Sequence, residues 1–124
     1  MKHKFWVKTN MGSIRTWKIG APSAQHHVVI FTGLSEFCEK YLELISFLTN
    51  HDMEVLIFDW PGLGLSGAYG NPPTTSHTAG FDDLLQAGCD VIDKSGWADK
   101  RFFVLGHSMG GHLAFRLAGL AKYQ

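Results

Sequence analysis

Three short apolar runs stand out along the chain, separated by longer segments of mixed polarity. The runs are Val28–Phe31 (VVIF), Val55–Phe58 (VLIF) and Phe102–Leu105 (FFVL). Each is rich in β-branched or aromatic residues and is apolar at successive positions, so neither face of a strand built from it would suit water. The three runs therefore predict buried strands of a parallel sheet.

Helical periodicity follows each of these runs. Three segments carry apolar residues at the spacing of one helix face: Glu36–Asn50, His77–Lys94 and Met109–Lys122. In Glu36–Asn50 the apolar positions i, i+4, i+7, i+8 and i+11 are Phe37, Tyr41, Leu44, Ile45 and Leu48. We expect three helices that alternate with the strands.

The N-terminal region and one loop complete the predicted order of elements. KFWVKT and SIRTWKI flank Asn10-Met11-Gly12, which indicates two antiparallel strands joined by a short turn. Gly67–Ser76 contains two consecutive prolines and is expected to be an irregular loop. Because right-handed crossovers place alternating helices on both sides of parallel strands, the order predicts an α/β fold with a mostly parallel sheet and helices on both faces.

Composition limits the classes of function. The 124 residues are 45% hydrophobic and 18% charged, as expected for one globular domain, and the formal net charge is zero. A neutral chain lacks the basic surface that nucleic acids or anionic membranes attract, so neither partner is expected. No apolar run approaches the ~18 residues of a transmembrane segment. The basic N-terminus MKHKFWVKTN leads into no apolar core of a secretory signal, so a soluble, cytoplasmic protein is expected.

No cofactor and no metal ion are expected from the sequence. Cys38 and Cys89 lie far apart, in no CxxC motif, and are interpreted as small buried residues in a reducing compartment. There is no HExxH motif, no Cys/His cluster and no P-loop. GLGLSG at Gly62–Gly67 matches GxGxxG, but Pro61 before it and Asn71-Pro72-Pro73 behind it leave no helix to receive a dinucleotide phosphate.

A serine between glycines follows the last apolar run. Gly106-His107-Ser108-Met109-Gly110 is a G-x-S-x-G motif between a predicted strand and a predicted helix, the context of a nucleophile elbow. Such a turn is so tight that side chains two residues on either side of the serine would collide, which requires glycine there. The helix start also directs free N–H groups at developing negative charge. The motif predicts Ser108 as a nucleophile; the alternative is a glycine-rich turn with an incidental serine.

Three segments, in order, resemble the α/β-hydrolase superfamily. VLGHSMGGHLAFRLA resembles its nucleophile region, FTGLSEFCEKYLELISFL its oxyanion loop and first helix, and FDWPGLGLSG the segment after the next strand. More narrowly, they are similar to the branch of lysophospholipases, monoacylglycerol lipases and serine aminopeptidases. The resemblance covers essentially the whole chain but maps onto the N-terminal half of the family's domain. Residues 1–124 are therefore expected to form a partial α/β-hydrolase domain.

The resemblance implies a chemistry and its residues. Ser108 matches the nucleophile that forms an acyl-enzyme, and the backbone N–H groups of Met109 and Leu34 match the oxyanion donors. Asp59 matches an aspartate that holds its own loop in place. Thr32 stands where the branch usually has a histidine whose side chain braces the oxyanion loop. The implied substrate is a carboxylic ester, either a small molecule or a lipid-like acyl compound.

The partners of the serine are not identifiable in the sequence. In this fold the acid and then the histidine follow the serine along the chain. The sixteen residues after Ser108 contain His112 and no acid, and His112 should lie alongside the last helix. His107 is expected to pack on the other side of the elbow, and His77, in a loop, is the remaining candidate. We expect no triad within the chain, which leaves a hydrolase that takes its acid and base from elsewhere or an inactive remnant or binding module.

The resemblance to the α/β-hydrolase superfamily also predicts an exposed sheet edge. The run Phe102–Leu105 is central in the resembled fold, but the sequence that would pair with its outer side is absent from these 124 residues. An apolar strand at an unprotected edge favours pairing with another chain. We therefore expect aggregation, self-association through this edge, or a chain that is part of a longer product.

Overall fold

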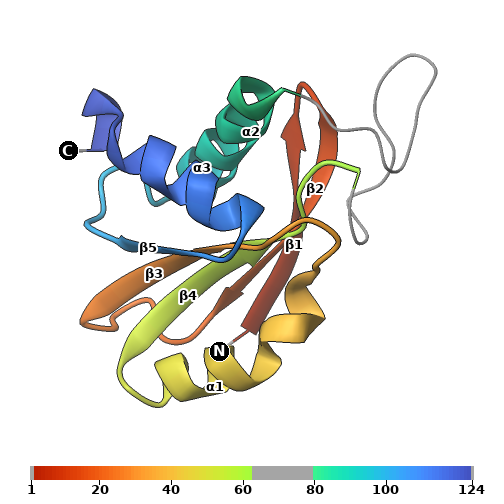
Figure 1. Ribbon diagram of the computed structural model, residues 1–124. Helices are drawn as coiled ribbons and strands as arrows, with labels where there is room; N and C mark the ends of the chain where they lie inside the picture. Colours follow the sequence, from red (N-terminus) through yellow and green to blue (C-terminus); the bar gives the residue numbers. More distant parts are fainter. Residues whose placement is uncertain (1, 63–79, 124) are drawn as a thin grey trace.

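The fold is a five-stranded sheet with helices on both faces (Figure 1). A computed structural model describes residues 2–62 and 80–123. The strands are β1 (Lys2–Thr9), β2 (Gly12–Ile19), β3 (His26–Phe31), β4 (Met53–Phe58) and β5 (Phe103–Gly106). The helices are α1 (Leu42–Thr49), α2 (Phe81–Lys94) and α3 (Met109–Ala118), with 3-10 turns η1 (Cys38–Tyr41) and η2 (Ala121–Tyr123).

The three apolar runs form the parallel part of the sheet, as predicted. The strand order is β1-β2-β4-β3-β5, with β3 parallel to both β4 and β5. The N-terminal strands form the expected hairpin, in which Thr9 is opposite Gly12, and β2 joins the hairpin to β4 in antiparallel pairing. The carboxyl ends of β3, β4 and β5 therefore point in the same direction, which brings the loops that follow them together.

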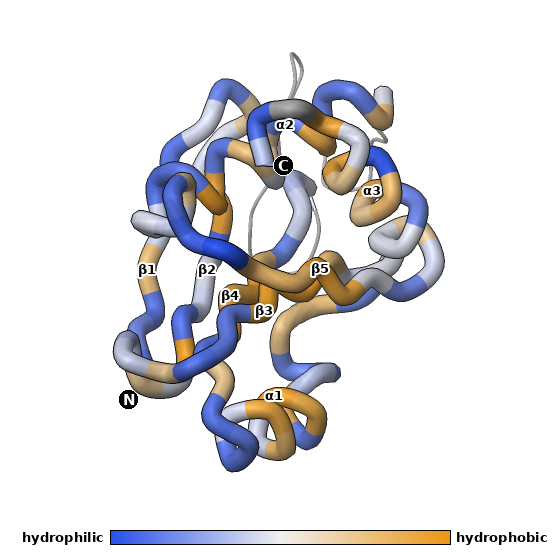
Figure 2. Tube along the Cα trace, turned by 90° about the vertical axis from the view of Figure 1, so that its left-hand side faces the viewer, coloured by the Kyte–Doolittle hydropathy of each residue, from blue (hydrophilic) through white to orange (hydrophobic). Residues whose placement is uncertain are grey.

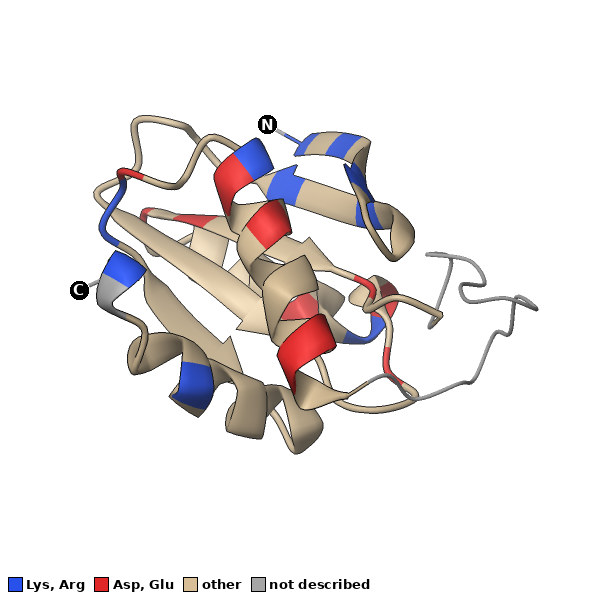
Figure 3. Cartoon of the chain, turned by 90° about the horizontal axis from the view of Figure 1, so that it is seen from above, with Lys and Arg blue, Asp and Glu red and all other residues tan. Residues whose placement is uncertain are grey.

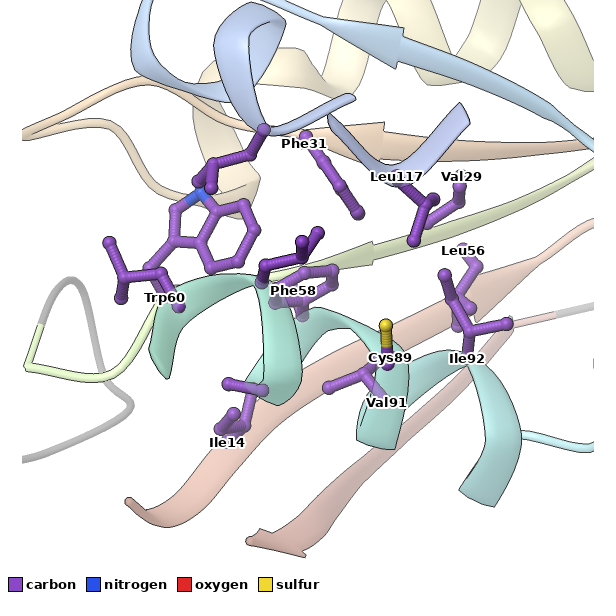
Figure 4. Close-up of a cluster of buried hydrophobic side chains, with 14 of the residues drawn as sticks. Ile14, Val29, Phe31, Leu56, Phe58, Trp60, Cys89, Val91, Ile92 and Leu117 are labelled. Atoms are coloured by element: carbon purple, nitrogen blue, oxygen red, sulfur yellow. The ribbon is translucent and has the colours of Figure 1, made fainter. Parts of the chain in front are cut away.

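Each side of the sheet has its own apolar core because side chains alternate along a strand. Val28 and Ile30 of β3 pack with α1, whereas Val29 and Phe31 pack with α2 and α3. Figure 2 shows α1 on one side of the strands and α2 and α3 on the other. Figure 4 shows the larger cluster, in which Phe31, Phe58 and Trp60 contact one another edge to face.

Two predicted helices are shorter than the sequence indicated. The segment Glu36–Asn50 is not one helix, because Phe37 is extended (φ −150°, ψ 167°) and η1 then turns the chain into α1. The last helix ends at Ala118 instead of Lys122, and Gly119 occupies its C-cap. Glycine disfavours helix by about 1 kcal/mol relative to alanine, which favours an end at this position. The predicted loop Gly67–Ser76 and the predicted helix start at His77 lie outside the described residues.

The two edges of the sheet differ in polarity. Figure 3 shows the basic residues of the β1–β2 hairpin, where Lys2 and Lys4 lie 4.8 Å and 5.0 Å from the centre of the Trp17 ring. Lysines on an edge strand disfavour pairing with another chain. The opposite edge is β5, as predicted, and its Phe103 is 63% exposed. Across the described ranges, no helix combines the length and apolar character that crossing a membrane requires.

Candidate active site

Ser108 has a strained backbone at the junction of β5 and α3. Its φ of 58° and ψ of −120° place it among the few non-glycine residues of the described chain with positive φ. L-amino acids adopt such angles only where the surrounding structure enforces them, and they cluster at functional sites. The tight turn that the G-x-S-x-G motif predicts is therefore present.

Two glycines of the motif allow this turn to pack closely. A Cβ atom on Gly106 would overlap the carbonyl group of Gly110, and a Cβ on Gly110 would overlap the carbonyl groups of Phe31 and Thr32. In addition, the N–H of His107 donates to the carbonyl of Phe31 over 3.2 Å. The start of α3 thus lies directly against the carboxyl end of β3, the position from which the next loop begins.

That loop makes a tight turn beside the elbow. The N–H of Glu36 donates to the carbonyl of Gly33 over 3.2 Å, and Ser35 within the turn has a φ of 65°. The carbonyl oxygen of His107 lies 3.1 Å from the position that a Cβ on Gly33 would take. Glycine at position 33 therefore lets the turn approach the backbone that leads into Ser108.

Several backbone N–H groups of this region have no acceptor among the described residues, and two of them are those that the sequence matched to oxyanion donors. They belong to Leu34, in the turn, and to Met109, the first residue of α3. The N–H of Gly33, in contrast, donates to Oε1 of Glu36 over 2.5 Å. The Leu34 amide, unlike that of Gly33, is therefore not engaged among the described residues. The Leu34 side chain is itself 56% exposed.

A partly buried charge network fixes the far end of the same loop. Nε of Arg15 donates to Asp59 over 2.7 Å, and its two terminal nitrogens donate to Glu39 over 2.7 and 2.6 Å. Asp59 also accepts the N–H of Cys38 over 2.9 Å. The hydrogen bonds from Arg15 are the main reason that the pKa of Glu39 falls to about 2. Asp59 thus holds the loop, but the sequence analysis missed Arg15 and Glu39, whose pairing no local motif indicates.

Thr32 does not brace the loop through its side chain. Its hydroxyl is buried and has no hydrogen-bond partner among the described residues. Instead, the Thr32 carbonyl accepts a 2.7 Å hydrogen bond from Nε1 of Trp60, which lies in the aromatic cluster of Figure 4. The indole therefore supplies a brace to the main chain at the position where the resembled branch uses a histidine side chain.

The two histidines near Ser108 in the sequence contact other side chains in the described structure. His107 was expected to pack on the other side of the elbow, but its side chain is 67% exposed, and Nδ1 lies 3.3 Å from the Glu36 carboxylate. The His107 N–H and carbonyl face Phe31 and Gly33, so the backbone occupies the inner side and the ring points outward. His112 lies against Phe81 with a ring distance of 4.8 Å. His77 lies outside the described residues.

Both cysteines are buried and free. Burial is the main reason that the pKa of each thiol, Cys38 and Cys89, is raised above its ordinary value. Over residues 2–62 and 80–123, no three His, Cys, Asp or Glu side chains are grouped as metal ligands. The candidate GxGxxG motif beginning at Gly62 falls largely outside the described residues.

The strained serine, the glycine packing and the adjacent turn match one family. Residues 22–124 match the family model described as serine aminopeptidase, S33. The chain belongs to this family. The S33 match extends from β3 through α3 and so includes both the Gly33 turn and the Ser108 elbow.

Three curated relatives of this S33 family member carry the names of enzymes that hydrolyse lipid esters. The chain is 33% identical over 99 residues to phospholipase YtpA of Bacillus subtilis, 36% identical over 98 residues to lysophospholipase L2 of Escherichia coli, and 37% identical over 107 residues to monoglyceride lipase of Mus musculus. These alignments cover 80%, 73% and 84% of the chain but 36%, 28% and 33% of the relatives. The chain thus spans about a third of the length of the curated relatives it matches.

Solved structures agree on the fold. A lipase in its open form superimposes with a TM-score of 0.81 at 19% identity, covering 99% of this chain and 41% of the lipase. A thioesterase domain from the curacin biosynthetic pathway gives a TM-score of 0.80 at 21% identity, with coverage of 99% and 41%. The S33 family member therefore has a partial α/β-hydrolase fold.

Proposed function

We propose that this S33 family member is a serine hydrolase of carboxylic esters, with Ser108 as the nucleophile. The observation that carries the proposal is the strained backbone of Ser108 between β5 and α3. A non-glycine residue at φ 58° and ψ −120° costs about 1–3 kcal/mol, and such strained residues cluster at functional sites. The names of the relatives favour a small or lipid-like acyl substrate, such as a lysophospholipid or a monoacylglycerol.

The reaction follows from the positions of the proposed groups. Oγ of Ser108 attacks the acyl carbon while a base takes the hydroxyl proton, and the acyl oxygen gains negative charge. The N–H groups of Leu34 and Met109, which bond to no described acceptor, would donate to that oxygen. The ester C–O bond then breaks, the alcohol leaves with the proton, and water hydrolyses the acyl-enzyme to acid and free Ser108.

The base and its orienting acid are proposed to lie outside residues 1–124. Within the described ranges, His112 lies against Phe81 and His107 pairs with Glu36, so each of the two neighbouring histidines has another contact. The second candidate is an inactive remnant or binding module that retains the fold alone. The observation favouring it is that His107 and His112, the histidines nearest to Ser108 in the sequence, are engaged with Glu36 and Phe81. We also propose a cytoplasmic location, which the free thiols of Cys38 and Cys89 support.

Labelling with a fluorophosphonate tests these alternatives on the 124-residue chain. Since the oxyanion donors remain when the base is missing, we expect Ser108 to be labelled at least about tenfold faster than the exposed Ser46. The rate should rise with pH without a plateau near neutrality, because no histidine activates the hydroxyl. Peptide mass spectrometry locates the adduct, Ser108→Ala abolishes it, and Ser46→Ala is the matched control.

Each outcome separates the proposals. Labelling of Ser108 at the rate of Ser46 would overturn the nucleophile assignment and support the inactive module. Rapid labelling of Ser108 with a plateau near neutral pH, or turnover of a short-chain aryl ester that Ser108→Ala abolishes, would overturn the proposal that the base lies outside this chain.

A further inference from the structure

Glu36 connects two segments that are remote in sequence. Its carboxylate accepts the N–H of Gly33 over 2.5 Å and the hydroxyl of Tyr41 over 2.6 Å. Nδ1 of His107, 71 positions further along the chain, lies 3.3 Å from the same carboxylate. The side chain therefore contacts both ends of its own loop and the residue immediately before Ser108.

We propose that Glu36 is a positioning residue whose carboxylate fixes the Gly33 turn against the Ser108 elbow and thereby sets the place of the Leu34 N–H. This inference rests on the proposed function, because it concerns the geometry of the oxyanion donors. The charged hydrogen bond to Gly33 also removes the Gly33 amide from competition for the oxyanion. A shorter side chain without an acceptor at position 36 would leave the turn less constrained.

The close packing of the turn supports this role. An added Cβ on Gly33 would lie 2.7 Å from Oε1 of Glu36 and 3.1 Å from the His107 carbonyl, so the turn lies between carboxylate and elbow. Ser35 within the turn has a φ of 65°, a conformation that needs support from its surroundings. Hydrogen bonds to a carboxylate are stronger than those between neutral groups, so the Glu36 carboxylate is suited to support the strained turn.

The electrostatics agree with a carboxylate that stays ionised. Partial burial by itself would raise the pKa of Glu36, but the hydrogen bonds from Tyr41, Gly33 and His107 together lower it below its ordinary value. The charged residues of η1, which follows Glu36 in the chain, are engaged elsewhere. Glu39 pairs with Arg15, and Lys40 lies over the Phe37 ring. Tyr41 and His107 are thus the titratable groups seen to face Glu36 in the described ranges.

The Gly33 amide reports the proposed contact by NMR of the whole chain. In the wild type, its proton resonance should titrate with a midpoint below the ordinary glutamate pKa, and Tyr41→Phe should raise that midpoint because it removes a donor. Glu36→Ala should shift the resonance upfield and increase amide hydrogen exchange about tenfold, since a charged hydrogen bond is lost. Glu36→Gln, which retains an acceptor, should restore most of the protection, and Glu43→Ala on the exposed side of α1 is the matched control.

Fluorophosphonate labelling of the same variants separates this proposal from the proposed function. We expect labelling of Ser108 to slow about tenfold in Glu36→Ala, with recovery in Glu36→Gln and no change in Glu43→Ala. If Gly33 responds as described but Ser108 is never labelled selectively, the contact is real and the nucleophile assignment fails. An unchanged Gly33 amide in Glu36→Ala, or unchanged labelling despite a displaced amide, overturns the positioning role.

Discussion

Gly110 lies against the backbone carbonyl of Phe31 with no room for a methyl group between them. This contact joins the start of α3 to the carboxyl end of β3, and it lies two residues beyond Ser108. A carbonyl in a sheet cannot move aside as a flexible side chain can. The position of the Ser108 hydroxyl relative to the Gly33 turn therefore depends on the absence of a side chain at position 110.

Gly110→Ala should lower the free energy of unfolding by about 3 kcal/mol or prevent folding, because the added methyl overlaps backbone atoms. The neighbouring Gly111→Ala is the matched control. Its Cβ would meet the Gly106 carbonyl oxygen at 3.5 Å, an ordinary contact, and alanine favours helix by about 1 kcal/mol. Urea denaturation of both variants measures the difference. Equal stabilities would contradict the packing described for the elbow.

The Arg15–Glu39 pair should make stability depend on pH in the acid range. Because the pKa of Glu39 is lowered to about 2 in the folded chain, its contribution is present above the ordinary glutamate pKa near 4.5 and is lost as the pH falls toward 2. Glu39 is 44% exposed, so solvent screening leaves on the order of 1 kcal/mol. Glu39→Gln should be less stable than wild type by this amount at pH 7 and equal to it below pH 2. A difference that persists at low pH would exclude the ion pair as its cause.

The thiols of Cys38 and Cys89 should resist alkylation in the folded chain. Burial raises the pKa of both, so almost no thiolate is exposed at neutral pH. Iodoacetamide at pH 7.5 followed by mass spectrometry should find neither cysteine modified, and both modified in urea. Rapid modification of Cys89 alone in the native chain would show that α2 opens locally.

We propose that the 124-residue chain associates with a second copy through β5. Phe103 of β5 and Phe115 of α3 are 63% and 83% exposed, and both line a groove of about 540 Å³ beside this edge. Unpaired strand edges with apolar side chains favour pairing with another strand. Sedimentation velocity should show a concentration-dependent dimer that Phe103→Lys weakens at least about tenfold, since charged residues protect edges.

The matched control for this association is Phe47→Lys. Phe47 is 59% exposed on α1, so its substitution removes similar apolar surface without changing a residue of β5. Equal weakening by both substitutions would point to non-specific aggregation. A monomer at all concentrations would contradict the proposal.

Local patterns in the sequence determined the order of strands and helices and the turn at Ser108. Apolar runs such as Val28–Phe31 must be buried wherever they lie, and the glycines at positions 106 and 110 are needed by the turn itself. These requirements act over a few residues, so a linear pattern expresses them. The single helix predicted over Glu36–Asn50 was wrong because Phe37 and Tyr41 continue the helical spacing of apolar residues. In the structure, Phe37 has an extended backbone, so the chain enters η1 and α1 only after it.

Only the tertiary structure decided which charged groups meet at the site. Arg15 reaches Asp59 across 44 positions, and His107 reaches Glu36 across 71, so no spacing in the sequence indicates either pair. His107 meets Glu36 because parallel pairing of β3 with β5 brings the loops after these two strands together. Arg15 meets Asp59 because β2 pairs antiparallel with β4, which places Arg15 beside the carboxyl end of β4. The sequence by itself determined a tight glycine-flanked turn at Ser108 after a buried strand; strand pairing decided which carboxylate lies beside it.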